Sequence, residues 1–260
     1  MLKVIFIGDV VGPMGCKTVA KFLPTVKKKY DGIDLVVANA ENSAVGNGVS
    51  VESATYLLKN GCDVLTGGNH SFRNFSIHKF LSNNDSILRP YNLSRSSIGR
   101  GYLTIVVKGV SFAVINLMGQ AFLDSATSAF EEIKKILPKL ETKNILIDFH
   151  AEATGEKGAL ANFLDGKVSV VVGTHTHVQT NDCRILKKGT GFLTDVGMVG
   201  AYDSVLGVKP ELVIRRIITK LPTKFEFSEQ GDFIFNAVYI EIDEKTGLCN
   251  KIEPINEKIA

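Results

Sequence analysis

The sequence is poor in the features that mark membrane, secreted and nucleic-acid-binding proteins. Its 260 residues contain no apolar stretch approaching the ~20 residues that a membrane-spanning helix needs. The apolar run at 2–7 is too short for a signal peptide, and Asp9 follows it in place of a small-residue cleavage site. The net charge of +3, from 30 basic and 27 acidic residues, is too small and dispersed to indicate nucleic-acid or membrane binding. We therefore expect a soluble, cytoplasmic protein.

Cysteine is also scarce. The chain has four, which lie far apart and form no Cys-x-x-Cys pair: Cys16, Cys62, Cys183 and Cys249. This spacing favours reduced thiols over a disulfide framework or a zinc ribbon. The sequence likewise lacks an aromatic array of the kind that stacks single-stranded bases, so no direct nucleic-acid binding is predicted.

What the sequence does contain is a series of short apolar runs, rich in Val, Ile and Leu and bounded by Gly, Asn or Asp. Such runs are typical of buried strands. They occupy 2–7, 34–38, 63–66, 102–107, 111–115, 144–149, 168–172 and 191–194. Helical patterns between several of them predict parallel βαβ units in the first half of the chain.

Helices are expected from Pro13, over 51–60 between the N-cap Ser50 and Gly61, over 127–140, and over 210–220. A hairpin is expected at 100–116, with Lys108-Gly109 at its turn. Further strands are expected toward the C-terminus, at 183–194, 223–228, 233–243 and 248–255. This pattern favours a mixed sheet, or two packed sheets flanked by helices, in one domain spanning 1–260.

Polar side chains follow five of the predicted strands. They are Asp9, then Glu41 and Asn42, then Asn69 and His70, then Asp148 and His150, and finally His175 and His177. The carboxyl ends of strands are where α/β folds bind their ligands. Four of the five histidines lie at these positions. The fifth, His78, is expected on a solvated helix face at 73–82.

Each of these residues also has an ordinary structural explanation. Asp9 could cap the following helix, Glu41-Asn42 could be turn residues, and His150 could be a hydrogen-bonded core histidine. His175-x-His177 is more specific, because two imidazoles two residues apart on extended backbone point to the same side. The occurrence of all five motifs in this order is a more specific sign of a metal site than any one of them.

Taken along the chain, the motifs resemble the calcineurin-like metallophosphoesterase superfamily, whose pattern runs Asp, an acidic bridge, Gly-Asn-His, His and Gly-His-x-His. Two positions depart from it: Val11 stands where a histidine is usual, and Glu41-Asn42 replaces Gly-Asp. With both departures, the sequence resembles a narrower group, the YmdB-like phosphodiesterases. The segments that carry this likeness are 6–9, 39–42, 148–154, 173–178 and 195–198. The resemblance implies an α/β fold with mixed β-sheets in a layered α/β/β/α sandwich.

The resemblance also implies two metal ions, held by Asp9, Glu41, Asn42, Asn69, His150, His175 and His177. Glu41 would bridge them through both oxygens, and Asn42 would replace the imidazole missing at position 11. The first ion would take Asp9, Asn42 and His177; the second would take Asn69, His150 and His175. Mixed oxygen and nitrogen ligands suit iron first, or manganese or zinc, rather than calcium. A metal-bridging hydroxide would attack phosphorus, while His70 donates a proton to the leaving oxygen or stabilises its charge.

The implied substrate is a small phosphodiester, a 2′,3′-cyclic nucleotide before others. Two alternatives stay open. One is a metal-dependent amidohydrolase on a TIM barrel, although such barrels usually carry His-x-His at their first strand. The other is a nucleotide-binding regulatory protein with little catalysis. A homo-oligomer is compatible with the phosphodiesterase and with both alternatives.

Overall fold

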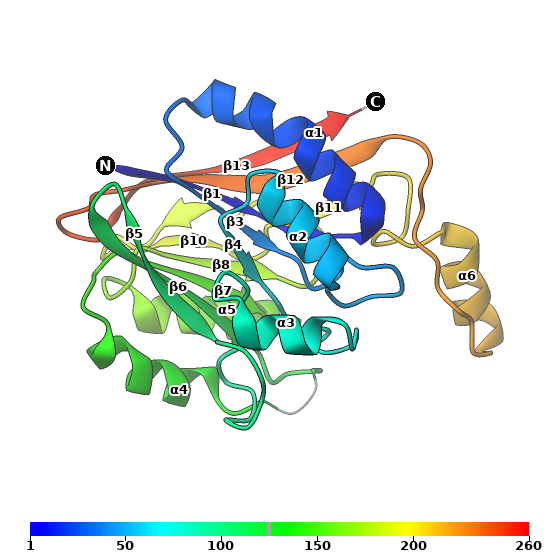
Figure 1. Ribbon diagram of the computed structural model, residues 1–260, viewed down its shortest axis with the longest axis horizontal. Coiled ribbons are helices and arrows are strands. Elements are labelled where there is room, and N and C mark those ends of the chain that lie inside the picture. The colour runs from blue at the N-terminus through cyan, green and yellow to red at the C-terminus, as the bar shows by residue number, and fades with distance from the viewer. Residues whose placement is uncertain (124–125, 260) are drawn as a thin grey trace.

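In a computed structural model, which describes residues 1–123 and 126–259, two β-sheets pack face to face between two layers of helices (Figure 1). The strands are β1 Leu2–Ile7, β2 Asp9–Val10, β3 Leu35–Asn39, β4 Val64–Thr66, β5 Tyr102–Val107, β6 Val110–Met118, β7 Ile145–His150, β8 Val170–Thr174, β9 Arg184–Ile185, β10 Gly191–Leu193, β11 Met198–Ala201, β12 Phe233–Ile242 and β13 Cys249–Ile259. The helices are α1 Gly12–Tyr30, α2 Val51–Lys59, α3 Ile77–Asn83, α4 Ala129–Ile136, the 3₁₀ helix η1 Leu137–Lys139, α5 Thr154–Leu164 and α6 Pro210–Thr219.

The first sheet is mixed and runs in the order β2-β11-β12-β1-β3-β4, with β13 also paired to β12. Strands β1, β3 and β4 are parallel, whereas β12 is antiparallel to β1 and β13. The long strand β12 pairs with β1 over 237–242 and with β11 over 233–235. Through β11 it therefore brings β2, and with it Asp9, beside the carboxyl end of β1.

The second sheet runs in the order β5-β6-β7-β8-β10-β9. Its centre, from β6 to β10, is parallel, and both edges are antiparallel. The edge strand β5 and its neighbour β6 form the expected hairpin. Lys108 and Gly109 at its turn both have positive φ, 49° and 76°, which the right-handed twist of a two-residue hairpin favours.

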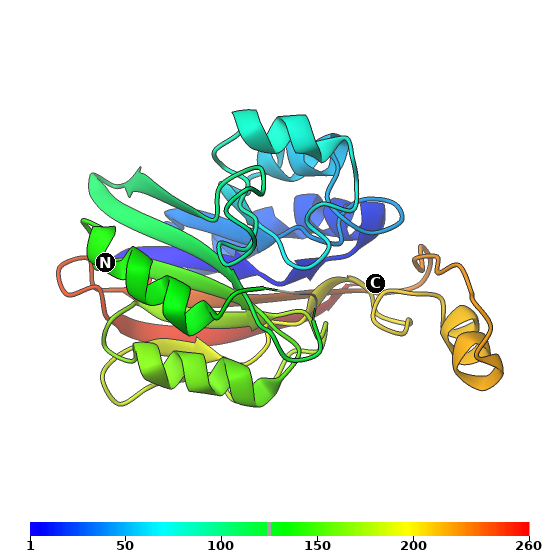
Figure 2. The same cartoon turned by 90° about the horizontal axis from the view of Figure 1, so that it is seen from below.

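Alternating side chains of the strands supply three separate apolar layers. In β1, Val4 and Phe6 face the second sheet, while Ile5 and Ile7 face the helices on the outer side. Helices α1, α2 and α3 cover the outer face of the first sheet, and α4 and α5 cover that of the second (Figure 2). Both faces of the central strands β1, β3, β7 and β8 are thus buried, which explains their nearly continuous apolar runs. The layered α/β/β/α prediction is confirmed.

Several local predictions are also confirmed. Helix α2 begins after Ser50, whose side chain accepts from Ser53 N in a capping box. Pro lies in the first turn of α1 and of α6, as its fixed φ favours. The four cysteines, all within the described residues, are free. No helix in the described ranges is both long and apolar enough to cross a membrane.

Other local predictions are wrong. The segment 223–228 is not a strand: it lies next to α6 on an arm that projects from the layers (Figures 1 and 2). Among the described residues, only the isolated bridge between Val208 and Phe227 connects it to other strand-like backbone. The helix expected over 127–140 is present over a shorter range: it begins at Ala129 and tightens to 3₁₀ geometry at Leu137, because Pro138 cannot donate to the preceding turn. Helix α5 was not predicted. The strands form two sheets, not a closed barrel, so the TIM-barrel amidohydrolase alternative is wrong.

Candidate metal centre

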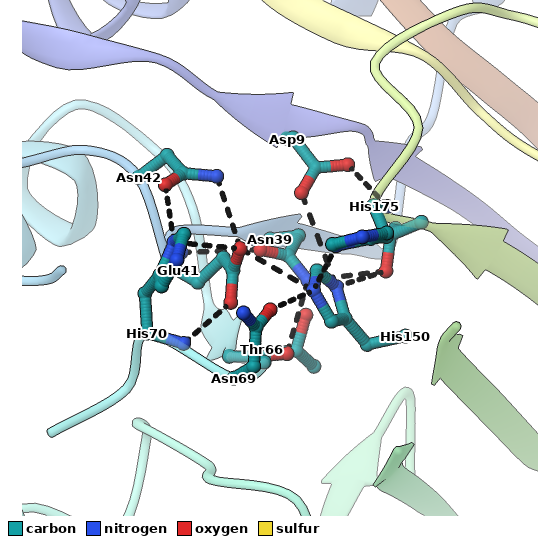
Figure 3. Close-up of polar contacts among 12 residues, drawn as sticks. Asp9, Asn39, Glu41, Asn42, Thr66, Asn69, His70, His150 and His175 are labelled. Carbon is teal, nitrogen blue, oxygen red and sulfur yellow. Dashed lines mark hydrogen bonds and ion pairs between the residues drawn. The ribbon is translucent and has the colours of Figure 1, made fainter. Parts of the chain in front are cut away.

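Residues at the ends of strands from both sheets come together in one cluster of polar side chains (Figure 3). The residues that end or follow β1, β3, β4, β7 and β8 there are Asp9, Glu41, Asn42, Asn69, His70, His150, His175 and His177. Asn39, the last residue of β3, connects the two sheets, since its Nδ2 donates to Asp148 Oδ2 in β7 at 2.9 Å. The structure therefore gathers every residue that the sequence singled out for the site.

The Nε2 atom of His150 lies at the centre of one group of candidate ligands. Asn69 Oδ1 is 3.0 Å from it and His175 Nδ1 is 3.1 Å from it. Glu41 Oε1 is 3.3 Å away. Ligand atoms of Glu41, His150 and His175 all lie within 4.8 Å of one another. Nitrogen and oxygen atoms that share an ion at about 2.0–2.2 Å are spaced in this way.

A second group lies on the other side of Glu41. Asn42 Nδ2 is 3.0 Å from Glu41 Oε1 and 3.2 Å from His177 Nε2. Asp9 Oδ1 is 3.9 Å from the same His177 nitrogen. The His177 ring is held from behind, because its Nδ1 lies 3.0 Å from the carbonyl oxygen of Leu206 and donates to it. In the neutral form of the ring, this bond leaves the lone pair on Nε2, the atom that faces Asn42 and Asp9.

Glu41 faces both groups through a single oxygen. Its Oε1 lies beside His150 and Asn42, whereas Oε2 accepts the backbone N–H of His70 at 3.0 Å. The expectation that both carboxylate oxygens bridge the two halves does not match this geometry. The tight turn after β4 directs the His70 N–H at Oε2 of Glu41, and this bond orients the Glu41 side chain. The other oxygen, Oε1, lies between the two groups of candidate ligands.

The environment of the Asp9 carboxylate is the strongest indication of a cation-binding site. Asp9 is fully buried, and its Oδ1 has no hydrogen-bond partner among the described residues. Its other oxygen accepts the backbone N–H of His175 at 3.0 Å. Burial raises the pKa of Asp9, and the neighbouring His177 and His150 only partly oppose this. A buried carboxylate oxygen without a partner is costly, and a metal ion beside His177 would remove that cost. The helix-cap explanation of Asp9 fails, because Val11 is the N-cap of α1.

The charge of His150 depends on the carboxylates around it. Burial lowers its pKa, but Glu41 and Asp9 outweigh burial and raise the pKa to about 9. Reciprocally, burial raises the pKa of Glu41, but His150 and His70 hold it well below its usual value. Burial and the charge of His150 lower the pKa of His175 to about 4. Without metal, His150 is therefore protonated at neutral pH, and His175 is neutral.

A hydrogen-bond chain behind His150 fixes which nitrogen faces the cluster. Thr174 Oγ1 donates its only proton to Asp148 Oδ1 at 2.7 Å, so it must accept from His150 Nδ1 at 2.9 Å. The buried Asp148 also accepts from Thr66 and Asn39. In the neutral imidazole this leaves the lone pair on Nε2, the atom in the cluster, as outer partners do for metal-bound histidines. Sequence reasoning assigned Thr174, Asp148, Thr66 and Asn39 no role; their only signal was their place at strand ends.

These pKa shifts predict how metal affinity depends on pH. An ion that takes the Nε2 lone pair of His150 must displace its proton below pH ~9, whereas His175 is already neutral. Affinity should rise by up to ~10-fold per pH unit between about 7 and 9 and then level off. Calorimetry in two buffers of different ionisation enthalpy should detect about one proton released per chain near pH 7.5. An affinity that stays constant from about pH 6.5 to 9 would contradict this.

The backbone of His175-x-His177 differs from the expected extended form. Strand β8 ends at Thr174, and His175 and His177 have φ angles of 107° and 65°. Residues other than glycine rarely adopt such positive φ angles, which cost about 1–3 kcal/mol for each residue. The two imidazoles face the cluster because the chain turns sharply at both residues, and not because they alternate along a strand.

His70 lies at the partly exposed rim of the cluster. Its Nδ1 is 2.9 Å from Asn42 Oδ1 and 3.4 Å from Glu41 Oε1. Because Nδ1 is engaged, Nε2 is the ring atom available to a bound molecule. His78, by contrast, lies in α3 away from the cluster. It is half-buried between Phe72 and Phe75, with Nε2 3.0 Å from the Phe72 carbonyl oxygen, so the expected solvated position is wrong.

Comparison with known proteins identifies the family of this chain. Residues 5–255 match the family model described as YmdB-like protein. The chain belongs to the YmdB-like family. It is 41% identical over 256 residues to the 2′,3′-cyclic-nucleotide 2′-phosphodiesterase of Bacillus subtilis, across 98% of this chain and 96% of that protein.

Two solved structures of similar chains share the fold over at least 99% of this chain. A structure described as a hypothetical protein from Thermus thermophilus superposes with a TM-score of 0.94 at 36% identity, covering 100% of both chains. A structure from Mycoplasma pneumoniae described as a novel phosphatase gives a TM-score of 0.93 at 34% identity, covering 99% of this chain and 94% of that one. The family resemblance read from the sequence motifs is thus confirmed.

Proposed function

We propose that this YmdB-like protein is a two-metal phosphodiesterase that hydrolyses small phosphodiesters, with 2′,3′-cyclic nucleotides as the first candidate substrates. Its family makes it a phosphoric diester hydrolase. The observation that carries the metal proposal is the buried Asp9 Oδ1, which has no partner in the described ranges and faces His177. We also treat 1–260 as one domain, because the two sheets share the apolar layer between them.

The residues divide into two ligand sets around Glu41 Oε1. One set comprises Asp9, Asn42 and His177, and the other comprises Asn69, His150 and His175. Both sets mix oxygen with imidazole nitrogen, which favours iron, with manganese or zinc as the other candidates. Ions held there would activate water at neutral pH and neutralise charge on the phosphate.

The side chain of Asn42 must present its oxygen to act as a ligand. In the structure its Nδ2 faces Glu41 and His177, and its Oδ1 faces His70. Oxygen and nitrogen of an amide exchange places on a half-turn, and their assignment depends on the surrounding hydrogen bonds. With the oxygen toward His177, the N–H would donate to His70 Nδ1. The proton of a neutral His70 would then reside on Nε2.

This arrangement suits His70 as the proton donor to the leaving oxygen. It lies beside both ligand sets without contributing to either, and its Nε2 is available at the rim. For a 2′,3′-cyclic nucleotide, hydrolysis at the 2′ ester breaks the bond between phosphorus and O2′ and forms a new bond between phosphorus and the water oxygen. The proton from His70 would convert the leaving O2′ into a hydroxyl, and the product would be a 3′-phosphate. The name of the Bacillus subtilis relative motivates this choice of ester.

The metal content of the purified protein tests the proposal directly. Protein made without added metal is expected to contain two transition-metal ions per chain by elemental analysis. It should hydrolyse 2′,3′-cyclic AMP and an aryl phosphodiester, and a chelator should abolish both activities. Fewer than two sites after saturation with iron, manganese or zinc would refute the two-metal assignment. Fully loaded protein that hydrolyses neither substrate would instead favour a regulatory, nucleotide-binding role.

A further inference from the structure

A buried ion pair lies directly behind the cluster of candidate metal ligands. Lys157 of α5 and Asp195, in the segment before β11, are both fully buried, and Lys157 Nζ is 2.7 Å from Asp195 Oδ2. Neither residue is a candidate ligand. The segment Asp195-Val196-Gly197-Met198 is one of those that carry the family likeness, yet the proposed chemistry gives it no task.

Asp195 holds the backbone of the His-x-His turn. Its Oδ2 accepts the N–H of Thr176 at 3.1 Å, and Thr176 is the residue between His175 and His177. Both histidines have left-handed backbone, which their side chains disfavour. Such a conformation persists only where its surroundings fix it. The bond from the Thr176 N–H to Asp195 lies between the two histidines and can fix the backbone of both. His175 belongs to one ligand set and His177 to the other.

The same carboxylate also holds the backbone beside Asp9. Asp195 Oδ1 accepts the N–H of Gly197 at 2.9 Å, and the Gly197 carbonyl oxygen accepts the N–H of Asp9 at 2.9 Å. Asp9 in turn accepts the N–H of His175. One buried carboxylate therefore connects the histidine turn and the Asp9 backbone, which come from different sheets.

Lys157 fixes the carboxylate from the far side. A Cβ at Gly173, two residues before His175, would lie 1.8 Å from the Thr194 carbonyl oxygen and 2.8 Å from Lys157 Cδ. Glycine at this position allows the lysine to pass β8 and reach Asp195. A buried lysine is rare unless it is paired, and burying this pair requires that each charge be satisfied.

We propose that the Lys157–Asp195 pair is a positioning element for the metal site, which holds Thr176 so that His175 and His177 face the ions. This inference rests on the proposed two-metal function. The alternative is that the pair only stabilises the packing of α5 on the second sheet. The two roles separate when fold stability and metal affinity are measured in the same variants.

Three variants make the test: Lys157→Met, Asp195→Asn, and the two combined. Each single change leaves one buried charge without its partner and should lower the melting temperature of the metal-free protein. The double variant has no unpaired charge, so its melting temperature should return toward that of the wild type. Asparagine offers one acceptor oxygen for two N–H groups, so metal affinity should stay about 10–100-fold lower and kcat should fall similarly, as for other outer-shell changes.

Leu160→Ala is the matched control. Leu160 lies one turn after Lys157 on the buried face of α5 and belongs to the apolar core between α5 and the second sheet. It should lower the melting temperature while metal affinity and kcat, measured below the transition, remain those of the wild type. A double variant that regains both stability and full metal affinity would overturn the positioning role. A wild type without bound metal would refute the proposed function itself, whereas a loaded wild type and an equally loaded double variant would refute only the role of the pair.

Discussion

Glu41→Gln is expected to abolish turnover, with kcat/KM lower by about 10⁴-fold or more, the size of loss seen for central catalytic groups. Glu41 Oε1 is the one oxygen close to both ligand sets, at 3.0 Å from Asn42 and 3.3 Å from His150. Glutamine keeps the shape and the bond from His70 but removes the negative charge that both ions would share. Metal content by elemental analysis should fall for both sites together.

Asn42→Ala is the comparison for this prediction. Asn42 supplies one neutral amide to one ligand set, so its loss should cost only about 10²-fold and should weaken the Asp9 and His177 site while the other stays loaded. If both variants lost metal and turnover equally, Glu41 would not be the bridge. Circular dichroism of the metal-free proteins would establish that both variants are folded.

His70→Ala is expected to keep both ions and lose about 10²–10⁴-fold in kcat, the usual contribution of a positioned acid or base. His70 reaches the cluster through Nδ1, at 2.9 Å from Asn42 Oδ1, and leaves Nε2 to the substrate. The loss should be smaller for a nitrophenyl ester than for a cyclic nucleotide, because a good leaving group needs little protonation.

His78→Ala is the control for His70. It lies eight residues further along the chain and is likewise partly buried, but its partners are Phe72 and Phe75 and not the cluster. Its turnover and metal content should equal those of the wild type. A His70→Ala protein that loses its metals, or that turns over cyclic nucleotides at full rate, would show that His70 is not the proton donor.

Local patterns in the sequence were sufficient to predict most strands and the edge at which the site lies. The apolar runs and the residues that end them are short-range features, and parallel strands bring their carboxyl ends to one edge whatever the details of packing. The likeness to YmdB-like proteins added the ligand assignment. Asp9, Glu41 and His150 were therefore all expected at one place before any contact was known.

Helix α5 and the segment 223–228 show where local patterns failed. Helix α5 contains Gly155 and Gly158, which weaken its intrinsic preference, and packing of Leu160 and Leu164 on the second sheet compensates for them. The segment 223–228 has the composition of a strand, but it lies on the projecting arm, where no neighbouring strand extends a ladder with it. Strand formation depends on pairing, which short-range composition does not specify.

The sequence by itself determined the layered α/β class, the family, and which side chains end the strands, because these follow from periodicity and from motifs of a few residues. Only the tertiary structure decided that Glu41 faces both ligand sets through one oxygen, that His175 and His177 turn through left-handed backbone, and that Thr174 orients His150. It also placed Lys157 against Asp195 behind the histidine turn. These contacts join residues far apart in the chain, and their distances depend on the register of two sheets and on the packing between them.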